Sequence, residues 1–168
     1  MVDGILKNSK ITDKHNKIEA IELTAFLDRL KDILPSPKPL RFTYVATIDI
    51  VYFNRVQLEQ VFNNLFSNAI RYNDKEQVEI KVAANEQEGY YNFDVTDNGM
   101  GIRAENKASV FELFSTVSEK DNYGLDSSGI GLSIVKKIIT AAEGEIKVNS
   151  TPGKFTSFSF RLKVPEKS

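Results

Sequence analysis

The stretch QVFNNLFSNAIRYND, residues 60–74, decides the fold, because it has the pattern of a helix with an unusual polar face. Asparagine is a mediocre helix former, since its amide competes with the backbone for hydrogen bonds, so three asparagines within six residues need a reason. At about 100° per residue, five polar side chains share roughly one quarter of the circumference, beside an apolar arc. The polar stripe is Gln57, Gln60, Asn64, Asn68 and Arg71, and the apolar stripe is Leu58, Val61, Leu65, Ala69 and Tyr72.

Carboxamides suit the border between a core and a polar site, because they offer hydrogen bonds and neutral oxygens without burying a net charge. An asparagine oxygen can complete an Mg²⁺ octahedron that is otherwise built of water and phosphate oxygens. A solvated face that happens to be rich in asparagine would give the same pattern. Asn54 and Gln57 have the spacing of a capping box, which predicts that the helix begins just after residue 54.

Around this helix, hydrophobic periodicity predicts further helices and strands. Alternating or β-rich runs cover residues 41–50, 77–85, 90–97, 145–150 and 154–164, and helical runs cover 21–34, 104–114 and 129–144. Consecutive strands are joined as hairpins, and helices interrupt them. This order predicts an α+β fold in which helices pack on one face of a sheet.

Composition narrows the classes of function. The chain has 168 residues, of which 41% are hydrophobic and 27% charged, as expected for one globular domain. A net charge of −1 and the absence of a long apolar run give no reason to expect nucleic-acid binding or membrane contact. There is no cysteine and a single histidine, His15, so thiolate chemistry and His-cluster metal sites are excluded. These features fit a cytoplasmic setting.

Two glycine stretches complete the set of motifs. VTDNGMGI, residues 95–102, places Asp97 at a strand end, where a carboxylate can accept from the amino group of adenine and would repel the carbonyl of guanine. DSSGIGLSIVKKI, residues 126–138, opens a helix with small residues, which favours an anion site. Each stretch alone is also typical of a surface turn or a plain helix cap. Neither matches a P-loop or a dinucleotide fingerprint.

In this order and spacing, the motifs resemble the catalytic and ATP-binding domain of bacterial sensor histidine kinases. That domain belongs to a superfamily shared with gyrase, MutL and the heat-shock chaperone ATPases. The resemblance covers roughly residues 20–165 and implies a Bergerat-type two-layer α/β sandwich with a mixed, mostly antiparallel sheet. The similar boxes are Asn64-x-x-x-Asn68-Ala69, Asp97-x-Gly99-x-Gly101, Phe111-Glu112-Leu113-Phe114, Ser128-Gly129-Ile130-Gly131-Leu132 and Gly153 to Thr156.

The resemblance implies roles for individual residues, with ATP and Mg²⁺ as cofactors. Asn68 would be the Mg²⁺ ligand, and the catalytic positions Asn64 and Arg71 would support the metal and the phosphates. Asp97 would bind the adenine amino group, and residues 114–128 would form a lid over ATP. The other nucleotide-binding positions would be Tyr72, Gly99, Gly101, Ile102, Phe114, Ser128, Gly129, Ile130, Gly131, Leu132 and Thr156.

The residue at position 64 separates a kinase from a stand-alone ATPase of the same superfamily. In the hydrolytic branch, a glutamate one turn before the metal-binding asparagine activates water, whereas Asn64 cannot act as a general base. Glu59 lies about 140° away around the helix and points elsewhere. The sequence therefore favours transfer of the γ-phosphate to another acceptor.

That acceptor would be a histidine on a separate helical hairpin, and a response regulator receiver domain would be a further partner. Residues 1–17 have the pattern of a hairpin tail plus a linker, and residues 18–168 would form the catalytic domain. His15 lies in the linker TDKHNK without the context of an acceptor. On this interpretation the chain is a fragment that binds ATP but does not phosphorylate itself.

Several positions depart from the family pattern and keep a third hypothesis open. Ser127 and Phe155 stand where glycines are usual, and Ser115-Thr116 replaces a pair that commonly carries an arginine. Lys107 or Lys120 could substitute for that arginine. A degenerate domain that only docks on a response regulator or a helical bundle would tolerate all three departures.

Overall fold

The main sheet has five strands in the order β2-β4-β5-β7-β6. The computed structural model describes residues 17–107, 109–111 and 131–166. Strands β2 and β4 are parallel, and every other neighbouring pair is antiparallel. This is the mixed, mostly antiparallel sheet that the resemblance implied. The strands are β2 (Leu40–Ala46), β4 (Val78–Gln87), β5 (Tyr90–Asp97), β6 (Glu145–Thr151) and β7 (Phe155–Lys163).

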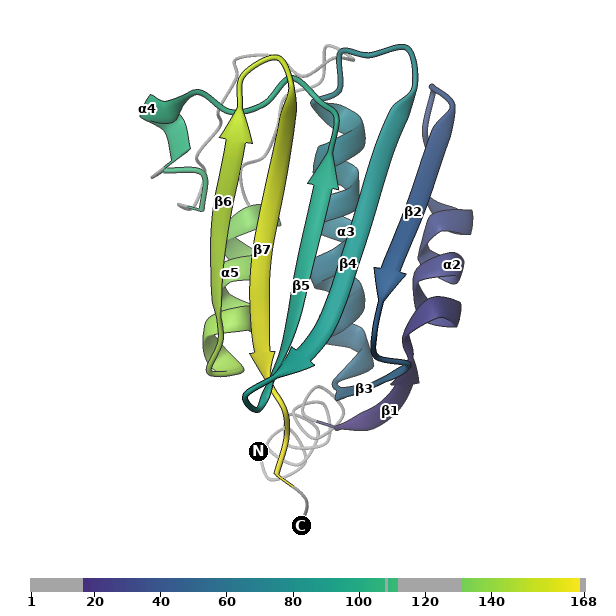
Figure 1. Cartoon of the computed structure of the whole chain (residues 1–168), viewed down its shortest axis with the longest axis vertical. Helices are drawn as coiled ribbons and strands as arrows, with labels where there is room; N and C mark the ends of the chain where they lie inside the picture. The colour runs from purple at the N-terminus through teal and green to yellow at the C-terminus, as the bar shows by residue number, and fades with distance from the viewer. Residues whose placement is uncertain (1–16, 108, 112–130, 167–168) are drawn as a thin grey trace, which may run out of the picture.

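Three helices cover one face of this sheet and leave the other face open (Figure 1). They are α2 (Leu23–Ile33), α3 (Arg55–Arg71) and α5 (Gly131–Ala141), and the short α4 (Ala104–Lys107) lies to the side of the sheet. The two-layer α+β architecture is therefore confirmed. No helix in the part of the chain that the structure describes is long and apolar enough to span a bilayer.

The predicted capping of α3 is also confirmed. The backbone of Asn54 is extended, and its side-chain oxygen accepts a hydrogen bond of 2.9 Å from the backbone N–H of Gln57. This bond satisfies one of the amides that the first turn of a helix leaves without a partner.

Two predictions near the N-terminal side were wrong in detail. The strand predicted over 41–50 ends at Ala46 as β2, and a separate strand, β3 (Ile50–Phe53), begins at Ile50; the helix predicted over 21–34 begins only at Leu23. The preceding residues form β1 (Glu19–Glu22), which pairs antiparallel with β3. The register places Ile21 opposite Val51, and both are fully buried. Burial of this pair across a small sheet explains why the residues before Leu23 are extended.

A cluster of aromatic rings fixes α3 against the sheet. The ring of Phe62 lies 5.5 Å from that of Phe93 on β5 and 5.7 Å from that of Phe160 on β7. It also contacts Phe26 of α2 at 6.0 Å and Phe66 one turn along α3 at 5.6 Å. Edge-to-face and tilted contacts of this kind add to the free energy gained from burial. They set the rotation of α3 and so the direction of its asparagine stripe.

The hairpin between β4 and β5 sets the position of the last residue of β5. Its turn residues Glu88 and Gly89 both have positive φ, 54° and 81°, as a two-residue type I′ turn requires. The resulting register pairs Asp97 with Ile80 on β4 and with Thr156 on β7. Asp97 is therefore the last residue of the central strand, at the end of the sheet that carries the loop after β5 and the β6–β7 turn.

Candidate functional site

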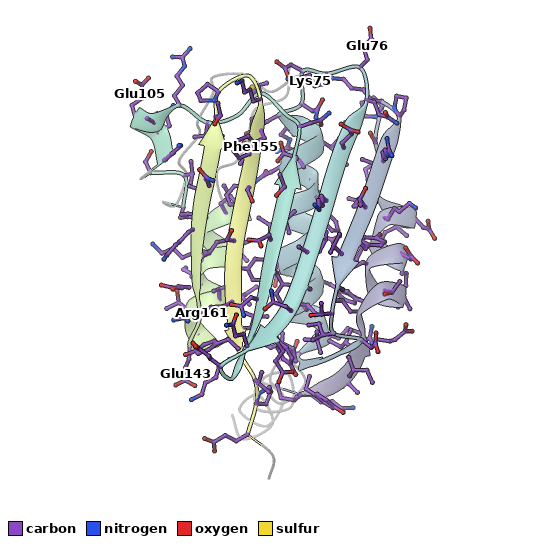
Figure 2. All side chains as sticks on the ribbon, viewed as in Figure 1. Lys75, Glu76, Glu105, Glu143, Phe155 and Arg161 are labelled. Carbon is purple, nitrogen blue, oxygen red and sulfur yellow. The ribbon has the colours of Figure 1, made fainter. Side chains whose placement is uncertain are left out.

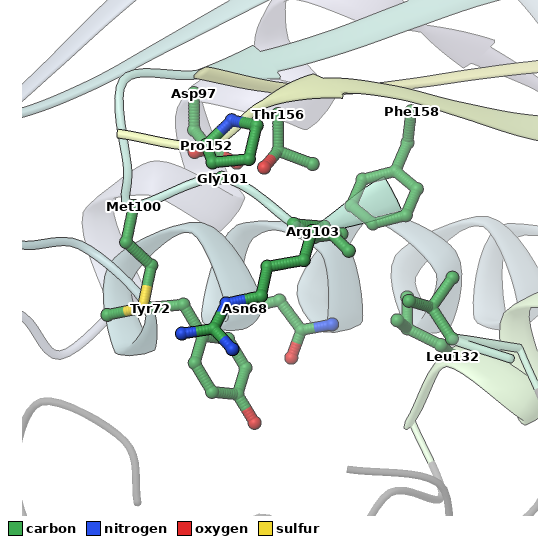
Figure 3. Close-up of a pocket in the computed structure, with 12 residues that line it drawn as sticks. Asn68, Tyr72, Asp97, Met100, Gly101, Arg103, Leu132, Pro152, Thr156 and Phe158 are labelled. Atoms are coloured by element: carbon green, nitrogen blue, oxygen red, sulfur yellow. The ribbon is translucent and has the colours of Figure 1, made fainter. Parts of the chain in front are cut away.

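A pocket of about 610 Å³ opens between α3, the loop after β5, the β6–β7 turn and the start of α5 (Figure 3). Seven residues predicted from the sequence line it: Asn68, Tyr72, Asp97, Gly101, Ile102, Leu132 and Thr156. The structure thus brings together side chains from four segments that are distant in the sequence. The remaining lining residues are Met100, Arg103, Val110, Pro152 and Phe158.

Asp97 is the buried acid of this pocket, with 8% of its surface exposed. Its Oδ1 accepts a 2.8 Å hydrogen bond from the backbone N–H of Gly99. Burial raises the pKa of Asp97 to about 7, although the Gly99 N–H and the positive charge of Lys75 act in the opposite direction. The pocket therefore holds a carboxyl group whose charge changes near neutral pH.

Backbone hydrogen bonds hold the loop after β5 on both sides. The Met100 N–H donates to the Tyr72 carbonyl at 3.0 Å, at the end of α3, and the Gly153 N–H donates to the Met100 carbonyl at 2.7 Å. Gly101 has φ +76°, and a Cβ there would lie only 2.5 Å from the Thr151 carbonyl oxygen. Only glycine fits this close approach of two backbones, so the loop and the β6–β7 turn form one wall.

The asparagine stripe of α3 lies at the other end of the pocket. Asn64 and Asn68 are both half-buried, one turn apart. A Cβ at Gly131 would lie 2.9 Å from Asn64 Oδ1, so the first residue of α5 is in contact with the Asn64 carboxamide. The start of α5 therefore lies beside the asparagine stripe of α3.

Glu59 points away from this region, as predicted from the helix geometry. Its carboxylate forms an ion pair with Arg29 of α2. Glu59 therefore contacts the neighbouring helix on the side of α3 away from the pocket.

Four predicted residues lie beside the pocket or outside it. Asn64 and Gly131 contact one another next to the lining residues, and Gly99 holds Asp97 from behind. Arg71 is half-buried at the C-terminal end of α3. The predicted lid at 114–128, with Phe114 and Ser128, lies outside the described residues, as do Gly129, Ile130 and His15.

The sequence also contained partial signals for the lining residues that were not predicted. Met100 lies inside the motif Asp97-x-Gly99-x-Gly101, and Phe158 is two residues after Thr156 on the same face of β7. Pro152 immediately precedes Gly153. Arg103 and Val110 had no distinguishing pattern, because their place depends on the path of the chain after β5.

The donors present fit a hard divalent cation that keeps most of its water and phosphate ligands. Within residues 17–107, 109–111 and 131–166, no group of three or more His, Cys, Asp or Glu side chains could hold a metal. Asn68 contributes a neutral oxygen donor from the lining of the pocket. Mg²⁺ is commonly bound through few protein oxygens together with substrate phosphates.

Comparison with known proteins identifies the family to which this fold belongs. The sequence profile of the family described as histidine kinase-, DNA gyrase B-, and HSP90-like ATPase matches residues 53–166. Cyanobacterial phytochrome B of Nostoc sp. is 30% identical over an alignment of 172 positions, which covers 96% of this chain and 22% of that protein. Sensor histidine kinase WalK of Bacillus subtilis is 27% identical over an alignment of 173 positions, which covers 99% of this chain and 28% of that protein.

Among solved structures, the mycobacterial sensor histidine kinase MprB is similar with a TM-score of 0.73 and 21% identity, over 90% of this chain and all of that chain. The fold and the pocket define an ATPase domain of the histidine kinase type. The chain belongs to the family of histidine kinase-, DNA gyrase B-, and HSP90-like ATPases. It spans about a fifth to a quarter of the length of the curated relatives named above.

Proposed function

We propose that this domain binds Mg·ATP and donates the γ-phosphate to a histidine on a separate helical hairpin in two-component signalling. The observation that carries this proposal is the arrangement of the pocket. A buried carboxyl group, Asp97, lies at one end, and the carboxamide of Asn68 lines the same pocket from α3 (Figure 3). Such a pair of groups would suit Mg·ATP, because a carboxylate can accept from the amino group of adenine and a carboxamide oxygen can bind Mg²⁺ at the phosphates.

The base would bind at the end closed by Asp97, Gly101 and Thr156. The ionised carboxylate accepts from the adenine amino group, whereas the carbonyl oxygen of guanine would meet it with like polarity. Ile102 and Tyr72 supply apolar surface for the faces of the ring. This arrangement supports selectivity for adenine over guanine.

The phosphates would lie along α3 toward the start of α5. Asn68 would hold Mg²⁺, which would neutralise negative charge on the phosphates, and Asn64 and Arg71 would support the same group. The contact between Asn64 and Gly131 supports this placement, because it joins the stripe to the amides of α5. Of the remaining predicted residues, Phe114 would belong to the lid at 114–128, and Ser128, Gly129 and Ile130 would hold the phosphates at the start of the helix.

Transfer rather than hydrolysis is favoured because the pocket has no carboxylate at the position one turn before Asn68. In the transfer step, the Pγ–O bond to ADP breaks while a P–N bond to the acceptor imidazole forms, and the imidazole N–H proton is released. The domain would contribute positioning and electrostatic stabilisation, with little covalent work of its own. The phosphoryl group would then pass to a response regulator receiver domain, in the cytoplasm.

A calorimetric titration tests the binding part of the proposal. The domain is titrated with a non-hydrolysable ATP analogue and with the corresponding GTP analogue, each with and without Mg²⁺. We expect Mg²⁺-dependent binding of the adenine analogue and at least about tenfold weaker binding of the guanine analogue. Absence of heat and of protection against thermal unfolding would contradict nucleotide binding and would favour a docking module.

A second assay tests the destination of the phosphate. The domain is incubated with ATP labelled at the γ-phosphate and with an isolated histidine-bearing hairpin of a sensor kinase. We expect acid-labile, base-stable label on the hairpin, as phosphohistidine requires. Steady phosphate release without any labelled hairpin would contradict transfer and would identify a stand-alone ATPase.

A further inference from the structure

Lys75 lies in the turn between α3 and β4, behind the base end of the pocket, and it is not a lining residue. It is found at the end of the sheet that carries the β6–β7 turn (Figure 2). Its Nζ lies 2.7 Å from Asp74 Oδ1, 3.2 Å from the Gly153 carbonyl oxygen and 3.5 Å from the Gly99 carbonyl oxygen. An ammonium group has three N–H donors, which equals the number of acceptors that Lys75 contacts.

The three acceptors come from the three segments that build the base end. Asp74 follows α3, Gly99 belongs to the loop after β5, and Gly153 belongs to the β6–β7 turn. Two of the contacts are to backbone carbonyls, so Lys75 links the backbone of the loop after β5 to that of the β6–β7 turn. An exposed lysine–carboxylate pair alone would contribute little, and the carbonyl contacts give the residue its structural role.

The backbone of Lys75 is itself fixed in place. Its N–H donates to Asn73 Oδ1 at 2.8 Å, and Asn73 is fully buried. The Asn73 amide donates in turn to Asn98 Oδ1 at 2.7 Å, which connects the turn to the residue directly after Asp97. The backbone of Lys75 is therefore held by hydrogen bonds, and its side chain contacts two loops. One of these loops is also linked to Asn73 through Asn98.

We propose that Lys75 is a positioning residue for adenine recognition, which holds the loop of Gly99 against the turn of Gly153 and places a positive charge behind Asp97. This inference rests on the proposed nucleotide binding and assigns a determinant of it outside the pocket. The mechanical part keeps the wall formed by Gly101 and Pro152 in place. The electrostatic part keeps Asp97 ionised so that it can accept a hydrogen bond from the base.

The charges around Asp97 support the electrostatic part. Burial raises the pKa of Asp97, and the charge of Lys75 lowers it. Arg103 is the other charged residue that lines the pocket, and Asp74 takes one donor of the Lys75 ammonium. Removal of the Lys75 charge leaves burial opposed only by the Gly99 N–H, so Asp97 would hold its proton to a higher pH.

Three substitutions separate the two parts. Lys75→Met removes the charge and the donors, Lys75→Gln keeps an amide donor without the charge, and Lys75→Arg keeps the charge. Lys81→Met, at an exposed position of β4, is the matched control. Binding of ADP and of adenosine is measured by calorimetry between pH 6 and pH 8.5, with thermal unfolding of each variant recorded alongside.

We expect Lys75→Met to weaken ADP and adenosine alike by about tenfold at pH 7, the size typical of losing a charge-assisted hydrogen bond. The pH at which affinity is half-maximal should rise in Lys75→Met and in Lys75→Gln, and stay at its original value in Lys75→Arg and Lys81→Met. A loss confined to ADP would contradict the proposal, because adenosine has no phosphate. If Lys75→Met fails to fold, the pH shift in Lys75→Gln provides the same test.

The inference and the proposed function fail in different ways. If the unsubstituted domain binds no nucleotide, the proposed function is wrong. If it binds adenosine with an unchanged affinity and pH profile in Lys75→Met and Lys75→Gln, nucleotide binding holds and the role of Lys75 is wrong. A uniform loss of affinity without a pH shift in both variants would contradict the electrostatic part.

Discussion

The two ends of the pocket are built in different ways. At the proposed base end a wall of backbone holds the Asp97 side chain: the loop after β5 is hydrogen-bonded to α3 through Met100 and Tyr72, to the β6–β7 turn through Gly153, and to the Asp97 carboxyl through the Gly99 N–H. At the proposed phosphate end the half-buried carboxamides of Asn64 and Asn68 lie on one face of α3, and Asn64 contacts Gly131 at the start of α5. The shape of one end depends on the course of the backbone, and the chemistry of the other depends on the side chains on one face of α3.

This difference would separate recognition of the base from the reaction at the phosphate. A wall of backbone groups depends little on side-chain identity and would suit the base of the proposed nucleotide. A helix face changes its chemistry by substitution at one position, as the contrast between Asn64 and a catalytic glutamate shows. We therefore expect changes at the base end to abolish binding, and changes at the phosphate end to alter what binding achieves.

The largest effect is expected at the buried acid of the base end. Asp97→Asn should weaken binding of an ATP analogue by about a hundredfold, because the amide turns a donor toward the adenine amino group. The same change removes a buried charge and should raise the free energy of unfolding of the empty domain at pH 8 by about 1–3 kcal/mol. Calorimetry and thermal unfolding measure the two effects. Lost binding together with lost stability would indicate a structural role only.

The phosphate end should respond differently to loss of its metal-binding carboxamide. Asn68→Ala is expected to weaken Mg·ATP binding by about thirtyfold, while adenosine binding without Mg²⁺ changes little, because the base end is intact. The ratio of the two affinities, measured by calorimetry with and without Mg²⁺, isolates the metal. Equal losses for adenosine and Mg·ATP would remove Asn68 from the metal site.

Solution pH should move binding and stability in opposite directions. The pKa of Asp97 is raised from its ordinary value of 3.8 to about 7 by burial. Adenine requires the ionised form, so affinity should fall by up to about tenfold per pH unit below pH 7. Between pH 3.8 and 7 the folded state holds a proton that the unfolded chain has released. The stability of the empty domain from this group is therefore greatest at low pH and is lost as pH rises toward 7.

Asp97→Asn is the control for both trends, since it removes the titrating group. Adenosine affinities from pH 5.5 to 8.5 and melting temperatures over the same range give the two profiles. A profile of the unsubstituted domain that matches that of Asp97→Asn would contradict the assignment of Asp97.

The smallest effect is expected where α5 meets the asparagine stripe. A Cβ in Gly131→Ala would lie 2.9 Å from Asn64 Oδ1, and the end of this side chain can rotate away. We expect about a threefold loss of Mg·ATP affinity and no change in adenosine affinity, because only the phosphate end is disturbed. A loss of adenosine affinity of the same size would show that the two ends are coupled through α3 and α5.

The strands and helices that carry a strong pattern could be predicted from the sequence. Strand β5 was predicted at its observed bounds, and the capping of α3 by Asn54 follows from the spacing to Gln57. The separate strand β3, which begins at Ile50, could not be predicted, because it depends on pairing with β1 from a distant part of the chain. Local propensity has no information about that partner.

The candidate site divides in the same way. Motif residues such as Asp97, Gly101 and Asn68 were placed in the pocket by short patterns in the sequence. Lys75 had no such pattern, since two of its acceptors are backbone carbonyls that any sequence would supply. Arg103 likewise lines the pocket only because of the course of the chain after β5.

Helix α3 serves the core with one side and the pocket with the other, through Phe62 and Asn68. A compound in the pocket would therefore contact the same helix that packs against the sheet. Ligands that bind only the native state stabilise it by about 2.7 kcal/mol at a hundred times their dissociation constant. The shift in melting temperature can thus rank fragments by how strongly they bind this domain, without an assay of the proposed activity.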